Sequence, residues 1–269
     1  VNFMNNPDEQ TAVAQFGKGD KYFGICTLMV TMPGLPMFGH GQIEGFNEKY
    51  GMEYKRAYWD ESADQELINR HAQQIFPLLK KRYLFANVDQ FYLYDFYESG
   101  GMVNENVFAY SNRAGQERAL VVYHNRFGDT AGWIHTSTAF MDKGSGTLRQ
   151  VDLRTGLDLP DDDHTFVIFR DAISGLQYIR NCGEVAQKGL YIQLDAYRAY
   201  VFLNFQIVRD DVNGTWKKVH EALKGQGVGD IWALQWQIPL RPVLKPLQEI
   251  FNAGYFRYLV DQRPRVYGE

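Results

Sequence analysis

Asp8 is the residue whose position most clearly suggests chemistry. It lies in the polar segment Asn5-Asn6-Pro7-Asp8-Glu9, directly after the apolar pair Phe3-Met4. This order predicts a strand that ends in a turn, with a carboxylate at its carboxyl end. A carboxylate in that place can accept hydrogen bonds from a ligand and stabilise positive charge that develops on it. The same residues also suit a turn or the first turn of a helix, so a helix-capping or turn role for Asp8 is the alternative.

A second strand end follows after one predicted helix. Residues 20–31 are apolar nearly all round, between Asp20 as a predicted N-cap and Pro33, which predicts a buried helix. The stretch Pro36-Met37-Phe38 then predicts a strand that ends at Gly39-His40-Gly41-Gln42. Strands that alternate with helices form parallel sheets, and in a (β/α)8 barrel their carboxyl ends form the active face. We therefore expect four polar side chains to lie near one another: Asn6, Asp8, His40 and Gln42.

The second strand end has two further interpretations. Its glycines would let a ligand or a supporting hydrogen bond approach the backbone beside His40 and Gln42, but an ordinary glycine-rich turn has the same composition. His40 and Glu44 are four residues apart, which is a metal-ligand spacing only on a helix. Gly41 and Gly45 argue against a helix there, so no metal site is predicted.

The two segments together resemble the last two barrel strands of the α-amylase-type glycoside hydrolases. The motif of the family's seventh strand is matched by Phe3, Asn6, Pro7 and Asp8, although proline stands where histidine is usual. The motif of the eighth strand is matched by Gly34, Pro36, Phe38, Gly41 and Gln42. With the following Arg56-Ala57-Tyr58-Trp59-Asp60, the resemblance covers roughly residues 1–86.

This resemblance implies a retaining enzyme that acts on α-glucans or maltooligosaccharides. Asp8 would be the aspartate that stabilises the transition state, while Asn6, His40, Gln42 and Tyr54 would bind substrate. The nucleophile and the acid/base would belong to an N-terminal part of the same polypeptide, so the chain is expected to be a carboxyl-terminal fragment that is inactive alone. A non-catalytic carbohydrate-binding or structural module on the same frame is the alternative.

The loop after the second strand is rich in aromatic residues: Phe46, Tyr50, Tyr54, Tyr58 and Trp59. On the active face they could stack against the C–H faces of sugars, although aromatic residues in such a loop more often simply pack in the core. Tyr54 is predicted to bind sugar. Trp59 precedes a predicted capping box, Ser62-x-x-Gln65, and is predicted to pack onto the first turn of a helix that Pro77 ends or kinks. His71, on the apolar side of that helix, is predicted to be a packing residue.

After Asn87 the pattern changes to short apolar runs between turn residues, which predicts an all-β domain over residues 87–210, built as an antiparallel sandwich or sheet. The predicted strands are Phe91–Phe96, Asn106–Tyr110, Ala119–Tyr123, Thr165–Phe169, Leu176–Ile179, Leu190–Leu194 and Tyr200–Val208. Residues 127–159 are predicted to be mainly loop with one or two weak strands. Residues 211–269 return to a helical period, from Trp216 to Lys224 and from Val243 to Phe256, and form a helical extension.

Composition limits the possible partners. The chain has 28 basic and 32 acidic residues, which gives no electrostatic signal for nucleic acid or for an anionic membrane.

Cys26 and Cys182 are predicted to be buried free thiols, which fits a reducing, cytoplasmic compartment. No cofactor is expected, because Gly225–Gly229 lacks the residues of a phosphate loop and is predicted to be a connector. Asp161–His164 is predicted to be a solvated turn.

Overall fold

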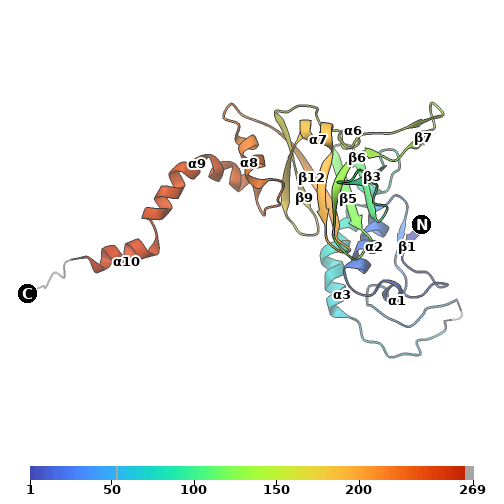
Figure 1. Ribbon diagram of the computed structural model, residues 1–269. Coiled ribbons are helices and arrows are strands. Elements are labelled where there is room, and N and C mark those ends of the chain that lie inside the picture. The colour runs from blue at the N-terminus through green and yellow to red at the C-terminus, as the bar shows by residue number, and fades with distance from the viewer. Residues whose placement is uncertain (53, 264–269) are drawn as a thin grey trace, which may run out of the picture.

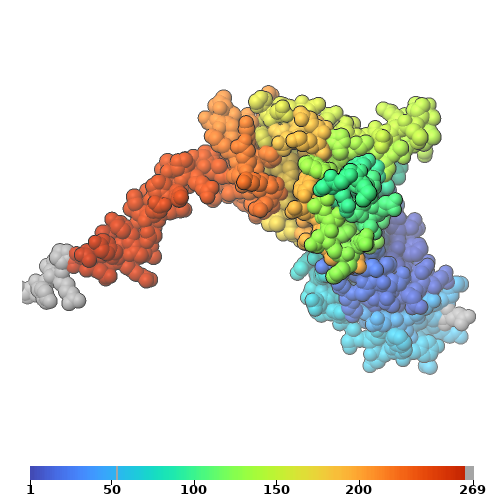
Figure 2. Space-filling model, in the orientation of Figure 1, coloured from blue at the N-terminus to red at the C-terminus, as the bar shows by residue number. Residues whose placement is uncertain are grey.

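The computed structural model describes residues 1–52 and 54–263 (Figure 1). The chain up to residue 86 forms a mainly helical lobe below a curled antiparallel sheet, and a helical arm extends away from the opposite side of the sheet (Figures 1 and 2). The all-β region and the helical extension are therefore present as predicted from the sequence.

The lobe begins with the predicted pair of parallel strands. β1 (Asn2–Phe3) pairs with β2 (Pro36–Met37), with Asn2 opposite Pro36. Helices α1 (Ala12–Phe16) and α2 (Asp20–Thr31) connect them. The apolar side chains of α2 are buried, as expected, but its N-cap is Gly19 and not Asp20. Within the described residues these two strands form a sheet of their own, so the remainder of a barrel is not seen.

The second half of the lobe consists of α3 (Gln65–Arg70), the π-helical turn η1 (His71–Ile75), α4 (Phe76–Leu79) and α5 (Arg82–Phe85). The predicted cap at Ser62 is wrong, because the carboxylate of Asp64 accepts the backbone N–H groups of Glu66 and Leu67, each at 3.1 Å. The helix thus starts later than predicted. Trp59 is 57% exposed, so its predicted packing role is also wrong.

A shared core joins the lobe to the sheet. The ring of Tyr110 is fully buried, and its hydroxyl lies 2.5 Å from Thr31 Oγ1 at the end of α2. A Cβ atom on Gly24 would lie 1.9 Å from the ring of Tyr123, so only glycine permits this close contact between α2 and the sheet. Cys26 is a buried free thiol in the same core, as predicted, and Cys182 is another in the sheet domain.

Eight antiparallel strands form one continuous sheet in the order β10-β9-β12-β5-β4-β3-β6-β11. Their bounds are β3 (Tyr92–Glu98), β4 (Val107–Ala114), β5 (Glu117–His124), β6 (Thr130–Ser137), β9 (Thr165–Asp171), β10 (Gln177–Asn181), β11 (Leu190–Leu194) and β12 (Ala199–Arg209). All seven predicted strands are confirmed, and they belong to one curled antiparallel sheet. The eighth, β6, contains Gly132 and lies in residues 127–159, which were expected to hold only one or two weak strands because they are rich in glycine, serine, threonine and aspartate. Gly132 is required, since a Cβ atom there would lie 2.2 Å from the carbonyl oxygen of Tyr97.

Short elements connect the strands of the curled sheet. α7 (Cys182–Lys188) joins the two edge strands, β10 and β11, and α6 (Leu153–Gly156) follows the protruding hairpin of β7 (Phe140–Asp142) and β8 (Thr147–Arg149).

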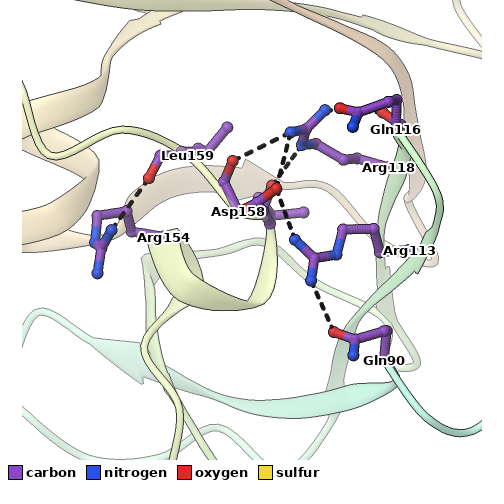
Figure 3. Close-up of polar contacts among 8 residues, drawn as sticks. Gln90, Arg113, Gln116, Arg118, Arg154, Asp158 and Leu159 are labelled. Atoms are coloured by element: carbon purple, nitrogen blue, oxygen red, sulfur yellow. Dashed lines mark hydrogen bonds and ion pairs between the residues drawn. The ribbon is translucent and has the colours of Figure 1, made fainter.

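Two arginines, Arg113 and Arg118, connect the β4–β5 hairpin to the turn after α6 (Figure 3). The buried Arg118 donates to the carbonyl oxygen of Leu157 at 2.6 Å, and both Arg118 and Arg113 form ion pairs with Asp158. Asp158 has a left-handed backbone conformation, with φ 51°.

The arm starts with α8 (Thr215–Leu223), which packs on the sheet through Trp216 and Val219. α9 (Ile231–Ile250) and α10 (Ala253–Asp261) then extend into solvent (Figure 2). α9 begins well before the predicted helical segment and contains three interior prolines: Pro239, Pro242 and Pro246. In the described part of the chain, no helix has both the length and the apolar character needed to cross a lipid bilayer.

Candidate functional site

The carboxyl ends of β1 and β2 meet at one edge of their small sheet. Just beyond them, the backbone of Gly39 lies against Asn5, so that a Cβ atom on Gly39 would be 2.5 Å from Asn5 Nδ2. Gln42 Nε2 lies 3.2 Å from the sulfur of Met4. The two polar segments after the strands are therefore in contact, as the spacing of the motifs predicts.

Asp8 lies at the surface of this edge. The side-chain oxygen of Asn6 accepts the backbone N–H groups of Asp8 at 2.8 Å and of Glu9 at 3.1 Å, and thus shapes the turn. The Asp8 carboxylate receives no hydrogen bond and no ion pair from the residues that the structure describes. The following helix is capped by Thr11, whose hydroxyl accepts the N–H of Ala14, so Asp8 does not cap it, and its position in a turn agrees with the turn alternative. The carboxylate is free to accept hydrogen bonds from a ligand.

Gln42 lies beneath the surface. Its side-chain oxygen accepts the N–H of Gly39 at 2.9 Å, and its backbone oxygen accepts the hydroxyl of Tyr22 at 2.9 Å. Only 2% of the residue is exposed. The side chain therefore holds the turn that carries His40, and a contribution to substrate binding, which stays a prediction, would act through that turn.

The same Tyr22 hydroxyl connects this turn to a buried histidine. Since its single hydrogen is donated to Gln42, it must accept a hydrogen bond from Nε2 of His71, 2.9 Å away. His71 is completely buried among aromatic rings, and desolvation lowers its pKa to about 4. The ring is thus neutral, with its proton on Nε2, and the partnerless Nδ1 carries a lone pair. The predicted packing role of His71 is confirmed.

His40 is exposed and belongs to an aromatic cluster, which we define as His40, Phe46, Tyr50 and Tyr54. The ring centres of His40 and Tyr50 are 4.8 Å apart, those of Tyr50 and Tyr54 are 4.5 Å apart, and those of His40 and Tyr54 are 6.0 Å apart. Desolvation, followed by the nearby Glu48 carboxylate, raises the pKa of Tyr54. The structure therefore brings two of the predicted site residues, His40 and Tyr54, together with Tyr50.

Two carboxylates hold the loop that carries this cluster. Glu61 accepts the backbone N–H groups of Asn47 at 2.7 Å and Glu48 at 2.8 Å. Glu48 in turn accepts the backbone N–H groups of Tyr58 at 2.9 Å and Trp59 at 3.2 Å. Partial desolvation tends to raise the pKa of Glu61, but the hydrogen bonds from Asn47 and Glu48 outweigh it and lower the pKa. Sequence reasoning missed both residues, because nothing in the local pattern indicates which carboxylate will fold back onto which amides.

Lys49 joins the loop to the Asp8 turn. Its ammonium group donates to the backbone oxygen of Asp8 at 3.0 Å. Gly51 lies nearby, since a Cβ atom on it would be 3.9 Å from the carbonyl oxygen of Pro7. The exposed carboxylate and the aromatic cluster are thus neighbours on one face. Sequence reasoning gave no role to Lys49.

The arrangement presents one exposed carboxylate, that of Asp8, next to a loop that carries aromatic rings. Retaining hydrolysis uses two carboxyl groups about 5 Å apart. In residues 1–52 and 54–263, no group of three or more histidine, cysteine, aspartate or glutamate residues is placed to hold a metal ion.

Comparison with known proteins gives a likeness of fold. No family model and no curated protein matches this chain. Among solved structures, it is similar to the α-amylase of Geobacillus thermoleovorans in complex with acarbose, at 12% identity and TM-score 0.49, over 76% of this chain and 38% of that one. It is also similar to a debranching enzyme of Nostoc punctiforme, at 14% identity and TM-score 0.45, over 75% and 33% of the two chains. The maltogenic α-amylase AmyB of Thermotoga neapolitana has 15% identity and TM-score 0.45, over 76% and 40%. The chain thus spans only 33–40% of the length of these three enzymes.

Proposed function

We propose that residues 1–86 form part of the glucan-binding face of an α-amylase-like glycoside hydrolase or transglycosidase. In this proposal Asp8 accepts hydrogen bonds from hydroxyls next to the reacting carbon, and its negative charge stabilises the cationic transition state. The nucleophile and the acid/base are supplied by carboxyl groups outside this chain.

The observation that supports the proposal is the common location of Asp8 and the aromatic cluster. Asp8 leaves its carboxylate to solvent, and Lys49 holds the cluster's loop against the backbone of the same residue. An α-glucan needs both kinds of contact, because a sugar ring presents an apolar C–H face on one side and hydroxyls around its rim. The rings of Tyr50 and Tyr54 can stack on the C–H face, and the carboxylate of Asp8 can accept hydrogen bonds from the hydroxyls.

Binding tests the proposal directly. Maltoheptaose is titrated calorimetrically into the 269-residue protein and into Tyr54→Ala. We expect affinity to fall about 5- to 100-fold, on the scale of one lost aromatic stacking contact. Tyr58→Ala is the matched control, because Tyr58 lies in the same loop, is 72% exposed and stands outside the aromatic cluster. Unchanged affinity in Tyr54→Ala would contradict the proposal.

Turnover tests the assigned role of Asp8. The chain should release no reducing sugar from starch, because Asp8 is neither the nucleophile nor the acid in this proposal. Release of sugar that disappears in Asp8→Asn would show that a complete catalytic site lies within the chain. Binding without turnover also fits the alternative of a non-catalytic carbohydrate-binding module. The exposed carboxylate of Asp8, which has no partner among the described residues, suits that function as well. A polypeptide that supplies the two other carboxyl groups would separate these cases, since only an enzyme would then lose turnover in Asp8→Asn.

A further inference from the structure

A cleft of about 1070 Å³ opens where the curled sheet fails to close. It lies between β10 and β11, the two edge strands, and beside α7, which joins them. The loop after α8 forms part of its rim, since Val228 pairs with Gln177 of β10. None of the residues assigned to the strand-end site lines this cleft.

Aromatic rings line the cleft at two levels. Its floor contains the buried rings of Phe169 and Phe202 with the half-buried Tyr178, whose ring centre is 5.9 Å from that of Phe169 and 5.5 Å from that of Phe202. At its mouth, Trp133 of β6 lies directly opposite Tyr191 of β11, with ring centres 5.1 Å apart. These two side chains are 36% and 37% exposed. The rings at the mouth therefore remain open to a ligand.

The polar lining of the cleft suits a ligand without net charge. Its walls carry four acidic and four basic side chains, so neither an anion nor a cation is favoured. Arg180 donates to the carbonyl oxygens of Ile179 at 2.8 Å and of Gly225 at 3.0 Å. In the described residues no carboxylate lies within ion-pair distance of it, and burial lowers its pKa. A guanidinium group has five N–H donors, so Arg180 keeps donors for neutral oxygen acceptors.

We propose that this cleft is a second carbohydrate site, which binds an α-glucan chain across the Trp133–Tyr191 pair. The two rings stack against the C–H faces of successive sugars, and Arg180 donates to their hydroxyls. The cleft is at the upper end of the size range of ligand pockets, which leaves room for an oligosaccharide. The identity of the sugar rests on the function proposed above, whereas the geometry of the cleft does not.

The indole N–H signal of Trp133 reports on this cleft alone. It is assigned in the nuclear magnetic resonance spectrum of the 269-residue protein by its disappearance in Trp133→Ala, and maltoheptaose is then added. We expect the signal to shift with added sugar and to shift equally in Tyr54→Ala protein. In Tyr191→Ala the affinity read from this signal should fall about 5- to 100-fold. Tyr191→Phe keeps the ring and should retain the affinity.

Matched variants keep the two proposals separate. Trp236 on α9 is 70% exposed and lies outside the cleft, so Trp236→Ala should leave the titration unchanged. A Trp133 signal that does not move while Tyr54→Ala abolishes binding would overturn the second site and leave the first intact. A moving Trp133 signal with unchanged calorimetric affinity in Tyr54→Ala would support the cleft and contradict the strand-end proposal. Trp236 is exposed and Tyr54 is half-buried, and circular dichroism checks that both variants fold.

Discussion

The strand-end region and the curled sheet obtain their shapes in different ways. β1 and β2 have two residues each, and the long loop after β2 depends on the Glu48 and Glu61 carboxylates. The sheet has strands of up to 11 residues, joined by continuous backbone ladders. A loop can present side chains to a ligand because few of its groups are committed to the core, and its shape then depends on a small number of polar contacts. Variants in the two regions should therefore differ in whether they change stability or binding.

The largest effect is expected where the two regions share a core. Tyr110→Ala removes a fully buried ring and its hydrogen bond to Thr31, so we expect the free energy of unfolding to fall by about 3–5 kcal/mol. Urea denaturation followed by circular dichroism measures this loss. Tyr110→Phe keeps the ring and should lose much less. If both variants lose equally, the ring does not carry the contact between lobe and sheet.

Acid should weaken the lobe through His71. Its pKa is lowered to about 4 in the folded protein, so between pH 6.5 and 4 the unfolded chain binds more protons. The contribution of His71 to stability is complete above pH 6.5 and is lost as the pH falls toward 4, by up to about 3 kcal/mol.

Denaturant titrations at several pH values measure this loss. In His71→Gln, whose amide can still donate to Tyr22, stability should fall less steeply with acid. Equal slopes in the two proteins would show that other groups, such as the carboxylates of Glu61 and Asp64, cause the acid sensitivity.

A smaller effect on stability, with a clear effect on binding, is expected for Glu61→Gln. The amide can accept at only one oxygen, so one of the N–H groups of Asn47 and Glu48 loses its partner. The free energy of unfolding should fall by about 1 kcal/mol. Hydrogen exchange at these two amides should become faster, and maltoheptaose should bind more weakly. A large drop in stability with unchanged exchange would contradict this distinction between the regions.

The smallest effect is expected for Asp158→Asn in the sheet domain. Its ion pairs with Arg113 at 2.8 Å and Arg118 at 3.3 Å are conspicuous in Figure 3, but the Asp158 side chain is 59% exposed. Solvent screening should limit the loss to about 0.5 kcal/mol, and asparagine tolerates the left-handed backbone. Arg118→Ala should cost more, because it leaves the buried carbonyl oxygen of Leu157 without its donor. Thermal melts of the two variants compare these losses.

Local pattern predicted the elements well where burial and period agree. The seven apolar runs became strands, and the parallel pair β1–β2 formed around a buried helix. β6 was expected only as a weak strand because residues 127–159 are rich in turn-forming residues, and the first half of α9 was missed because Pro239 and Pro242 contradict a helical preference. For the site, the motifs predicted that Asp8 and His40 lie at neighbouring strand ends. The burial of Gln42 and the contacts of Lys49 and Glu61 depend on residues distant in sequence, which no local pattern encodes.

The prolines of α9 determine where a protease should cut the arm. Each lacks an N–H, so the carbonyl groups of Gln235, Ile238 and Pro242, one turn earlier, lose their helical partners. The helix is therefore a series of weakly coupled turns, and its side chains after Ile238 are exposed. A protease should cut the arm at these turns while the sheet stays resistant, which would release the folded body as a discrete product.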